Sequence, residues 1–114
     1  MYDIETYFLV FIIIQFFHSI EELSTGFHKK CPFFKMKFGS FLAFEILFIM
    51  FWTAVYLLEQ FPFREKLMGY FILLMLANGI WHITWWGISK KYVPGIITAP
   101  LFVIAFIGYY SHLI

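Results

Sequence analysis

A histidine and two glutamates lie close together in the segment His18-Ser19-Ile20-Glu21-Glu22, at the end of a strongly apolar run. Glu45, Asn78 and His82 add polar side chains inside two other apolar runs. An ionisable side chain at membrane depth costs about 2.5–3.5 kcal/mol on insertion scales, so a group of them needs compensating partners. Imidazoles and carboxylates bind divalent metal ions and also act as general acids and bases. These residues are therefore where we look for function.

The spacing of these residues places them on common faces of α-helices. His18 and Glu21 are three residues apart, and His18 and Glu22 are four apart, so the three side chains share one face of a helix. Asn78 and His82 repeat the four-residue spacing in a later run. Separate helices can therefore direct polar groups at one point, provided that a common framework holds them.

Composition indicates that this framework is a membrane protein. Hydrophobic residues make up 62% of the 114 residues and charged residues only 13%, whereas soluble domains are about 45–50% apolar and about 25% charged. The net charge is +1 and no basic stripe is present, so we expect no nucleic-acid partner. Cys31 is the single cysteine, which excludes an intrachain disulfide and a cysteine-based zinc motif.

Helix-breaking residues divide the apolar sequence into four runs. Gly26, Pro62 and Gly87 follow the first three runs, and Pro94 opens the fourth. Each run has about the 20 residues that a membrane-spanning helix needs. The runs show no two-residue alternation, so strands are not expected. We expect an all-α fold, a membrane-embedded antiparallel four-helix bundle in a single domain over residues 1–114, with spans at about 4–23, 38–58, 67–86 and 94–112.

The basic residues predict the orientation of this bundle. Lysines concentrate in the first and third connections, which we expect to be cytoplasmic, with both termini outside or periplasmic in the cell (inner) membrane. These lysines are Lys29, Lys30, Lys35, Lys37, Lys90 and Lys91, against Arg64 and Lys66 on the opposite side. Trp85, Trp86 and Tyr92 flank the second lysine loop and are interpreted as an interfacial aromatic belt.

The polar residues of the different runs are expected at similar depths in the membrane. At about 1.5 Å per residue from the cytoplasmic end of each span, His18, Glu45 and His82 lie about 9–10 Å deep and Asn78 about 15 Å deep. Thr98 of the fourth run lies at a similar depth. The sequence therefore predicts one polar layer near the cytoplasmic face.

Simpler interpretations exist for several of these residues. Glu21 alone suits an interfacial carboxylate near the lysines of the first loop. Asn78 suits a hydrogen bond between two helices. Two further histidines are left out of the site, because His28 is expected on a loop surface and His112 at the outer end of the last span.

Three segments together resemble the HxxEE-domain proteins, a family of small membrane proteins. They are His18-Ser19-Ile20-Glu21-Glu22, Asn78-Gly79-Ile80-Trp81-His82, and Pro94-Gly95-Ile96-Ile97-Thr98. The resemblance covers nearly the whole chain. It implies that His18, Glu21, Glu22, Asn78 and His82 are signature positions, and it implies no particular reaction.

Two kinds of chemistry suit this set of residues. In the first, iron, manganese or zinc is bound by the five residues His18, Glu21, Glu22, Glu45 and His82. The metal would neutralise the buried carboxylates, although the His-x-x-Glu order differs from the Glu-x-x-His of ferritin-like bundles. In the second, His18, Glu22 and Glu45 act as a metal-free general acid and base on a lipid, a composition similar to that of sterol isomerases of the emopamil-binding type.

A third interpretation is not enzymatic: the polar layer serves an ion pathway, or the protein is an accessory subunit or a homo-oligomer. The outer halves of the spans are almost wholly apolar, which favours a one-sided pocket over a channel. We therefore predict first a metal-dependent enzyme that acts on a lipid-like substrate. Its substrate contacts are expected at Asn78, Trp81, Trp85 and Thr98.

Overall fold

The computed structural model of the chain describes residues 4–113, which contain helices and no strands. Three long helices dominate: α1 (Ile4–Thr25), α3 (Phe38–Leu57) and α4 (Arg64–Ser89). A single turn, α2 (Phe27–Lys30), follows α1, and α5 (Ala99–Leu113) closes the chain. The all-helical prediction is confirmed, as each apolar run carries a helix.

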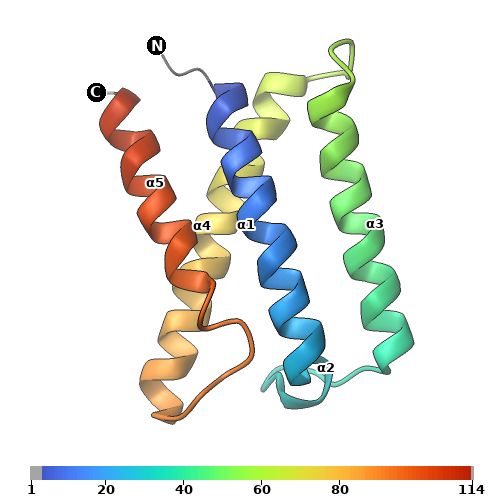
Figure 1. Cartoon of the computed structure of the whole chain (residues 1–114), viewed down its shortest axis with the longest axis vertical. Helices are drawn as coiled ribbons and strands as arrows, with labels where there is room; N and C mark the ends of the chain where they lie inside the picture. Colours follow the sequence, from blue (N-terminus) through green and yellow to red (C-terminus); the bar gives the residue numbers. More distant parts are fainter. Residues whose placement is uncertain (1–3, 114) are drawn as a thin grey trace.

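Successive long helices run in opposite directions, with α1 in contact with α3, α4 and α5 (Figure 1). The start of α1, the end of α5 and the loop between α3 and α4 lie at one end of the molecule (Figure 1). The short helix α2, the segment 31–37 and the segment 90–98 lie at the other end (Figure 1). The lysine-rich connections therefore share one end of the molecule, as the antiparallel order requires.

Three of the helices, α1, α3 and α4, are long and apolar enough to cross a membrane. The fourth run differs from the expected helix at about 94–112, because α5 begins only at Ala99 and has 15 residues. Val93, Pro94 and Gly95 are buried in a non-helical segment that precedes it. Pro100 then falls in the first turn of α5, where its missing N–H costs nothing.

Apolar residues fill the half of the molecule that contains the chain ends. This core joins α1, α3, α4 and α5, through side chains such as Phe8, Val55, Phe71 and Phe102, all fully buried. A second, smaller cluster of Phe27, Cys31 and Phe41 lies at the lysine-rich end. The polar side chains of the site lie along the helices between these clusters.

Large apolar side chains also cover the outside of every long helix. Phe17 of α1, Leu47 of α3, Leu73 of α4 and Ile104 of α5 are each more than half exposed. Extended apolar surface of this kind marks contact with lipid or with another protein.

Candidate metal centre

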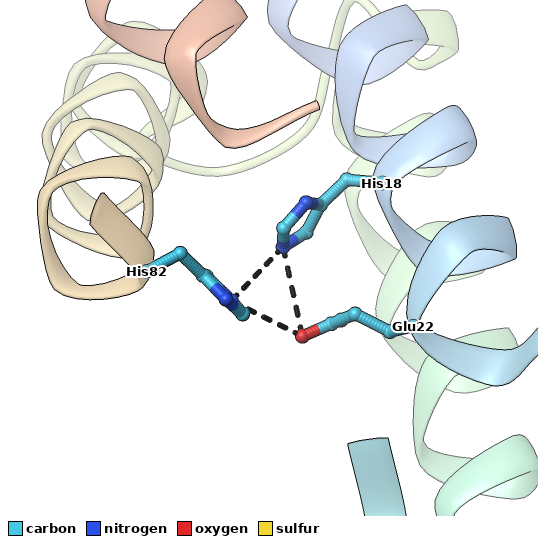
Figure 2. A group of neighbouring side chains, drawn as sticks. All are labelled: His18, Glu22 and His82. Atoms are coloured by element: carbon cyan, nitrogen blue, oxygen red, sulfur yellow. Dashed lines mark hydrogen bonds and ion pairs between the residues drawn. The ribbon is translucent and has the colours of Figure 1, made fainter. Parts of the chain in front are cut away.

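The side chains of His18, Glu22 and His82 converge on one point between α1 and α4 (Figure 2). The two histidine Nε2 atoms are 3.2 Å apart. Glu22 Oε2 lies 3.6 Å from Nε2 of His18 and 3.2 Å from Nε2 of His82. The three ligand atoms therefore form a nearly equilateral triangle.

Local helix geometry builds this triangle from two elements. His18 and Glu22 are four residues apart on α1 and project from the same face, and His82 faces them from α4 (Figure 2). Both imidazoles are fully buried and Glu22 is 5% exposed. A water-excluded triangle of two nitrogens and one carboxylate oxygen is thus held by helices rather than by loops.

The triangle has the dimensions of a metal site. With metal–nitrogen bonds of about 2.0–2.1 Å, two ligands of a tetrahedral ion are separated by about 3.3 Å. The three separations bracket this value. Two histidines and one carboxylate are also the ligand set of non-haem iron sites with open positions.

A hydrogen-bond relay fixes which nitrogen of His18 faces the triangle. The Thr98 hydroxyl donates its single proton to Glu21 Oε1 at 2.7 Å. Its oxygen lies 2.7 Å from His18 Nδ1 and can only accept there. His18 Nδ1 therefore carries the proton, and in the neutral ring the lone pair of Nε2 points at Glu22 and His82.

His82 is oriented by the segment before α5. Its Nδ1 is buried without a hydrogen-bond partner, and its ring lies near the backbone of Pro94. A proton on Nδ1 would leave the lone pair of Nε2 pointing into the triangle. Three acceptors would then converge there, and a cation or an extra proton would compensate them.

Gly95 allows the two imidazoles to approach the backbone so closely. Its φ of +96° is in the region that favours glycine. A Cβ at this position would lie 2.7 Å from Cε1 of both His18 and His82, and 2.9 Å from Nδ1 of His82. The bend at Gly95 therefore forms the wall against which both rings are stacked.

Glu21, predicted as a metal ligand, lies outside the triangle. Its carboxylate accepts hydrogen bonds from the backbone N–H groups of Gly95, Ile97 and Thr98 at 2.9–3.1 Å, and from the Tyr92 phenol at 2.6 Å. These donors belong to the non-helical segment and to the start of α5, where unpaired N–H groups and the helix dipole favour an anion. Glu21 therefore anchors the fourth run and does not contribute an atom to the triangle.

The Tyr92 phenol, predicted as part of an aromatic belt, completes this anchor. Burial, together with the hydrogen bond to the Glu21 carboxylate, raises the pKa of Tyr92 above its ordinary value. The phenol thus stays protonated and donates at physiological pH.

Glu45, also predicted as a ligand, belongs to an adjacent network rather than to the triangle. It accepts a short hydrogen bond from Ser19 Oγ, and its carboxyl is a neighbour of that of Glu22. Two neighbouring buried carboxylates repel each other, and a shared proton or a cation would relieve this repulsion. Glu45 therefore lies beside the triangle and is not one of its three corners.

A mostly apolar cavity of about 570 Å³ lies beside the triangle. Glu22 and Glu45 form part of its wall, together with two of the predicted substrate contacts, Asn78 and Trp81. Trp85 stacks on Trp81 and packs against the cluster around Phe27. Thr98, the fourth predicted contact, instead holds His18 and Glu21.

The sequence match decides the family. The model of the family described as "Protein of unknown function with HXXEE motif" matches residues 9–110. The chain belongs to the HXXEE family. No curated protein and no solved structure matches it. The residues of the HXXEE motif have different roles in the structure. His18 and Glu22 form two corners of the triangle, and Glu21 anchors the segment before α5 and orients His18 through Thr98.

Several residues around the triangle are not predicted from the sequence. Gln15 and Ser19 continue the α1 stripe of His18 and Glu22 at three- and four-residue steps, so periodicity could have found them. The contact of Gly95 with both imidazoles had no such signal. His28 was placed on a loop surface, but it is only 7% exposed, because its ring packs on Phe38 and Phe41.

Proposed function

We propose that this protein is an integral membrane metalloenzyme whose centre, His18, Glu22 and His82, acts on a lipid-like substrate. The observation that carries the proposal is the convergence of three buried ligand atoms, Nε2 of His18, Nε2 of His82 and Oε2 of Glu22, at 3.2–3.6 Å from one another. A divalent cation satisfies all three acceptors at once and compensates the buried carboxylate.

The donor atoms favour three metals. Nitrogen and oxygen ligands without a thiolate suit iron, manganese or zinc. Three protein ligands leave positions open for a substrate or water, as catalytic sites do. The bound metal would supply Lewis-acid or redox chemistry, and Glu45, next to Glu22, is placed to take up or release a proton.

A lipid-like substrate is favoured by the surroundings of the centre. The adjoining cavity is lined mainly by aromatic and aliphatic side chains. Phe44 of α3 and Leu74 of α4 line it and are about half exposed on the outer surface, so an apolar molecule has an entrance from the side. The core in the other half of the molecule consists of aliphatic and aromatic side chains without charged groups, which argues against an ion pathway.

The membrane placement rests on the three long apolar helices and on the exposed apolar surface. We propose that α5 with its preceding segment forms a fourth, partly non-helical span of an antiparallel bundle. Non-helical backbone at membrane depth requires internal partners, and Glu21 supplies them. The lysine loops then face the cytoplasm and the chain ends face outward.

The test is metal analysis of the purified, tag-free protein by mass spectrometry. We expect about one iron, manganese or zinc ion per chain, lost in His82→Ala. His112→Ala is the matched control, because this histidine is exposed on α5, and it should keep the metal. A wild-type protein that carries no metal and takes none up on titration overturns the metal proposal.

A metal-free lipid isomerase is the second candidate, and the contact between the Glu22 and Glu45 carboxyls favours it. A carboxyl pair that shares one proton can act as acid and base. Turnover of a lipid in the presence of a chelator would select this candidate over the metalloenzyme.

A further inference from the structure

A second polar network faces the cavity beside the metal centre. Gln15 and Glu45 line the cavity, and Ser19 connects them. Gln15 is 3% exposed and its Oε1 has no hydrogen-bond partner. A buried amide oxygen left without a donor costs about 1–3 kcal/mol, so it indicates a missing partner.

The direction of the hydrogen bonds fixes what kind of partner is missing. Ser19 donates its one hydroxyl proton to Glu45 Oε2, so its oxygen can only accept from Gln15 Nε2, at 3.1 Å. The amide of Gln15 is thereby oriented, and its Oε1 is the atom left over. If Glu45 shares a proton with Glu22 on its other side, Oε2 of Glu45 remains an acceptor. Ser19 therefore still donates to Glu45 in that case.

We infer that Gln15 Oε1 and the Glu45 carboxyl form a subsite for the hydroxyl group of a long-chain alcohol, whose hydrocarbon chain occupies the apolar cavity. The inference rests on the proposed function, because it names the substrate class of the same site. The cavity of about 570 Å³ is within the common range for small-molecule sites, about 300–1,000 Å³.

The network discriminates between head groups. A fatty acid would bring a carboxylate against the acceptors of Gln15, Glu22 and Glu45, which is unfavourable. An ether offers no proton to Gln15. With Glu22 and Glu45 already compensated by the metal or by a shared proton, an ammonium group would bring one more ion into a mostly apolar cavity. A hydroxyl donates one proton and remains neutral.

Competition photolabelling tests the inference on the purified protein in detergent. The probe is hexadecanol with a diazirine in its chain, and the competitors are hexadecanol, its methyl ether, hexadecylamine and hexadecanoic acid. We expect labelling of cavity-lining segments, and competition by hexadecanol that is about threefold to tenfold stronger than by the ether. Equal competition by alcohol and ether, or stronger competition by the ether, amine or acid, overturns the inference.

Gln15→Leu should remove the preference for the alcohol over the ether. Gln60→Leu makes the same chemical change on the exposed loop before α4 and should keep it. If the Gln15 variant fails to fold, the alcohol and ether comparison on the wild type still decides.

Each measurement is made with metal-loaded and with chelator-treated protein. A preference for the alcohol without any metal binding would refute the metalloenzyme and leave the subsite. A protein that binds metal but does not distinguish alcohol from ether would refute the subsite alone.

Discussion

The Thr98 hydroxyl lies 2.7 Å from Glu21 Oε1 and 2.7 Å from His18 Nδ1, and it links the anchor of α5 to the candidate metal centre. Because a hydroxyl has one proton, the contact with Glu21 decides the tautomer of His18. The two acidic residues of the motif thus act on the same histidine from opposite edges of its ring.

Replacing this hydroxyl should weaken metal binding without unfolding the protein. Thr98→Val keeps the shape of the side chain but removes the acceptor for His18 Nδ1. We expect metal affinity to fall about 10- to 100-fold, the usual effect of losing an outer hydrogen-bond partner of a ligating histidine. Competition with a chelating dye measures it, and Thr98→Ser should restore it.

Thr84→Val is the matched control for this variant. The Thr84 hydroxyl donates to the Ile80 carbonyl of its own helix, and Thr84 is exposed. An equal loss of affinity in both variants would contradict the relay.

Gly95→Ala should disrupt the centre by steric overlap. The added Cβ would meet Cε1 of both imidazoles at 2.7 Å, at a φ that L-residues rarely adopt. We expect loss of stoichiometric metal and a free energy of unfolding lower by about 1–3 kcal/mol, as for overpacked cores. Metal analysis and thermal unfolding in detergent measure the two effects.

Gly87→Ala provides the comparison, because a Cβ there meets nothing within 4 Å. It lies in α4, where alanine is favoured over glycine by up to about 1 kcal/mol. If the Gly95 variant keeps the metal content and stability of the Gly87 variant, the prediction is wrong, because the two imidazoles would then tolerate a displaced backbone.

The sequence allowed prediction of the residues whose partners are set by helical spacing. His18 and Glu22 share a face at a four-residue step, and counting residues from the loops put His82 at the same depth, so their convergence followed from periodicity. The non-helical segment before α5 could not be predicted from periodicity, because Pro94 also suits the start of a helix. It arises from the carboxylate of Glu21, which satisfies N–H groups that a helix would otherwise pair. Such long-range pairing of a side chain with a distant backbone leaves no periodic signal.

The same reason explains why Glu21 and Glu45 were predicted as ligands. Both carry the correct chemical group at nearly the correct depth, and sequence spacing does not resolve the rotation of one helix about its axis relative to another. Glu45 accepts a hydrogen bond from Ser19 and lies beside Glu22, and Glu21 accepts a hydrogen bond from the backbone N–H of Gly95. Both carboxylates remain next to the centre, one on its cavity side and one behind His18.

The lysine loops give a prediction for topology. Reporter fusions after Lys37 and after Lys91 should be cytoplasmic, and a fusion at the C-terminus should be exterior, because the basic residues of short loops stay inside. The two loops lie at the same end of the molecule (Figure 1). A cytoplasmic C-terminus would reverse the orientation and place the metal centre near the other face.

Arg64 should stabilise the opposite end of the molecule. It donates to the carbonyls of Val55 and Tyr56 at the end of α3 and pairs with Glu5 of α1 at 2.6 Å. Arg64→Met leaves those helix-end carbonyls without a donor and should lower the free energy of unfolding by about 1–3 kcal/mol. Lys66→Met removes a charge from an exposed position of the same turn and should change it by less than about 0.5 kcal/mol. Thermal unfolding of both variants in detergent makes the comparison.

The paired variants Glu22→Gln and Glu45→Gln should behave differently, although each makes the same change to a buried carboxyl. Glu22 contributes an oxygen to the triangle, so its amide variant should lose the metal. Glu45 does not, so its variant should keep about one ion per chain. A Glu45 variant that also loses the metal would make Glu45 a fourth ligand and require a rotation of α3.

Stability with and without chelator extends this test. A metal at 100 times its dissociation constant stabilises the folded state by about 2.7 kcal/mol. A chelator should therefore lower the unfolding temperature of the wild type and of Glu45→Gln, and leave that of Glu22→Gln unchanged. If the wild type is also indifferent to chelator, no metal links α1 to α4. The shared proton of the Glu22 and Glu45 carboxyls would then be the chemistry left to this site.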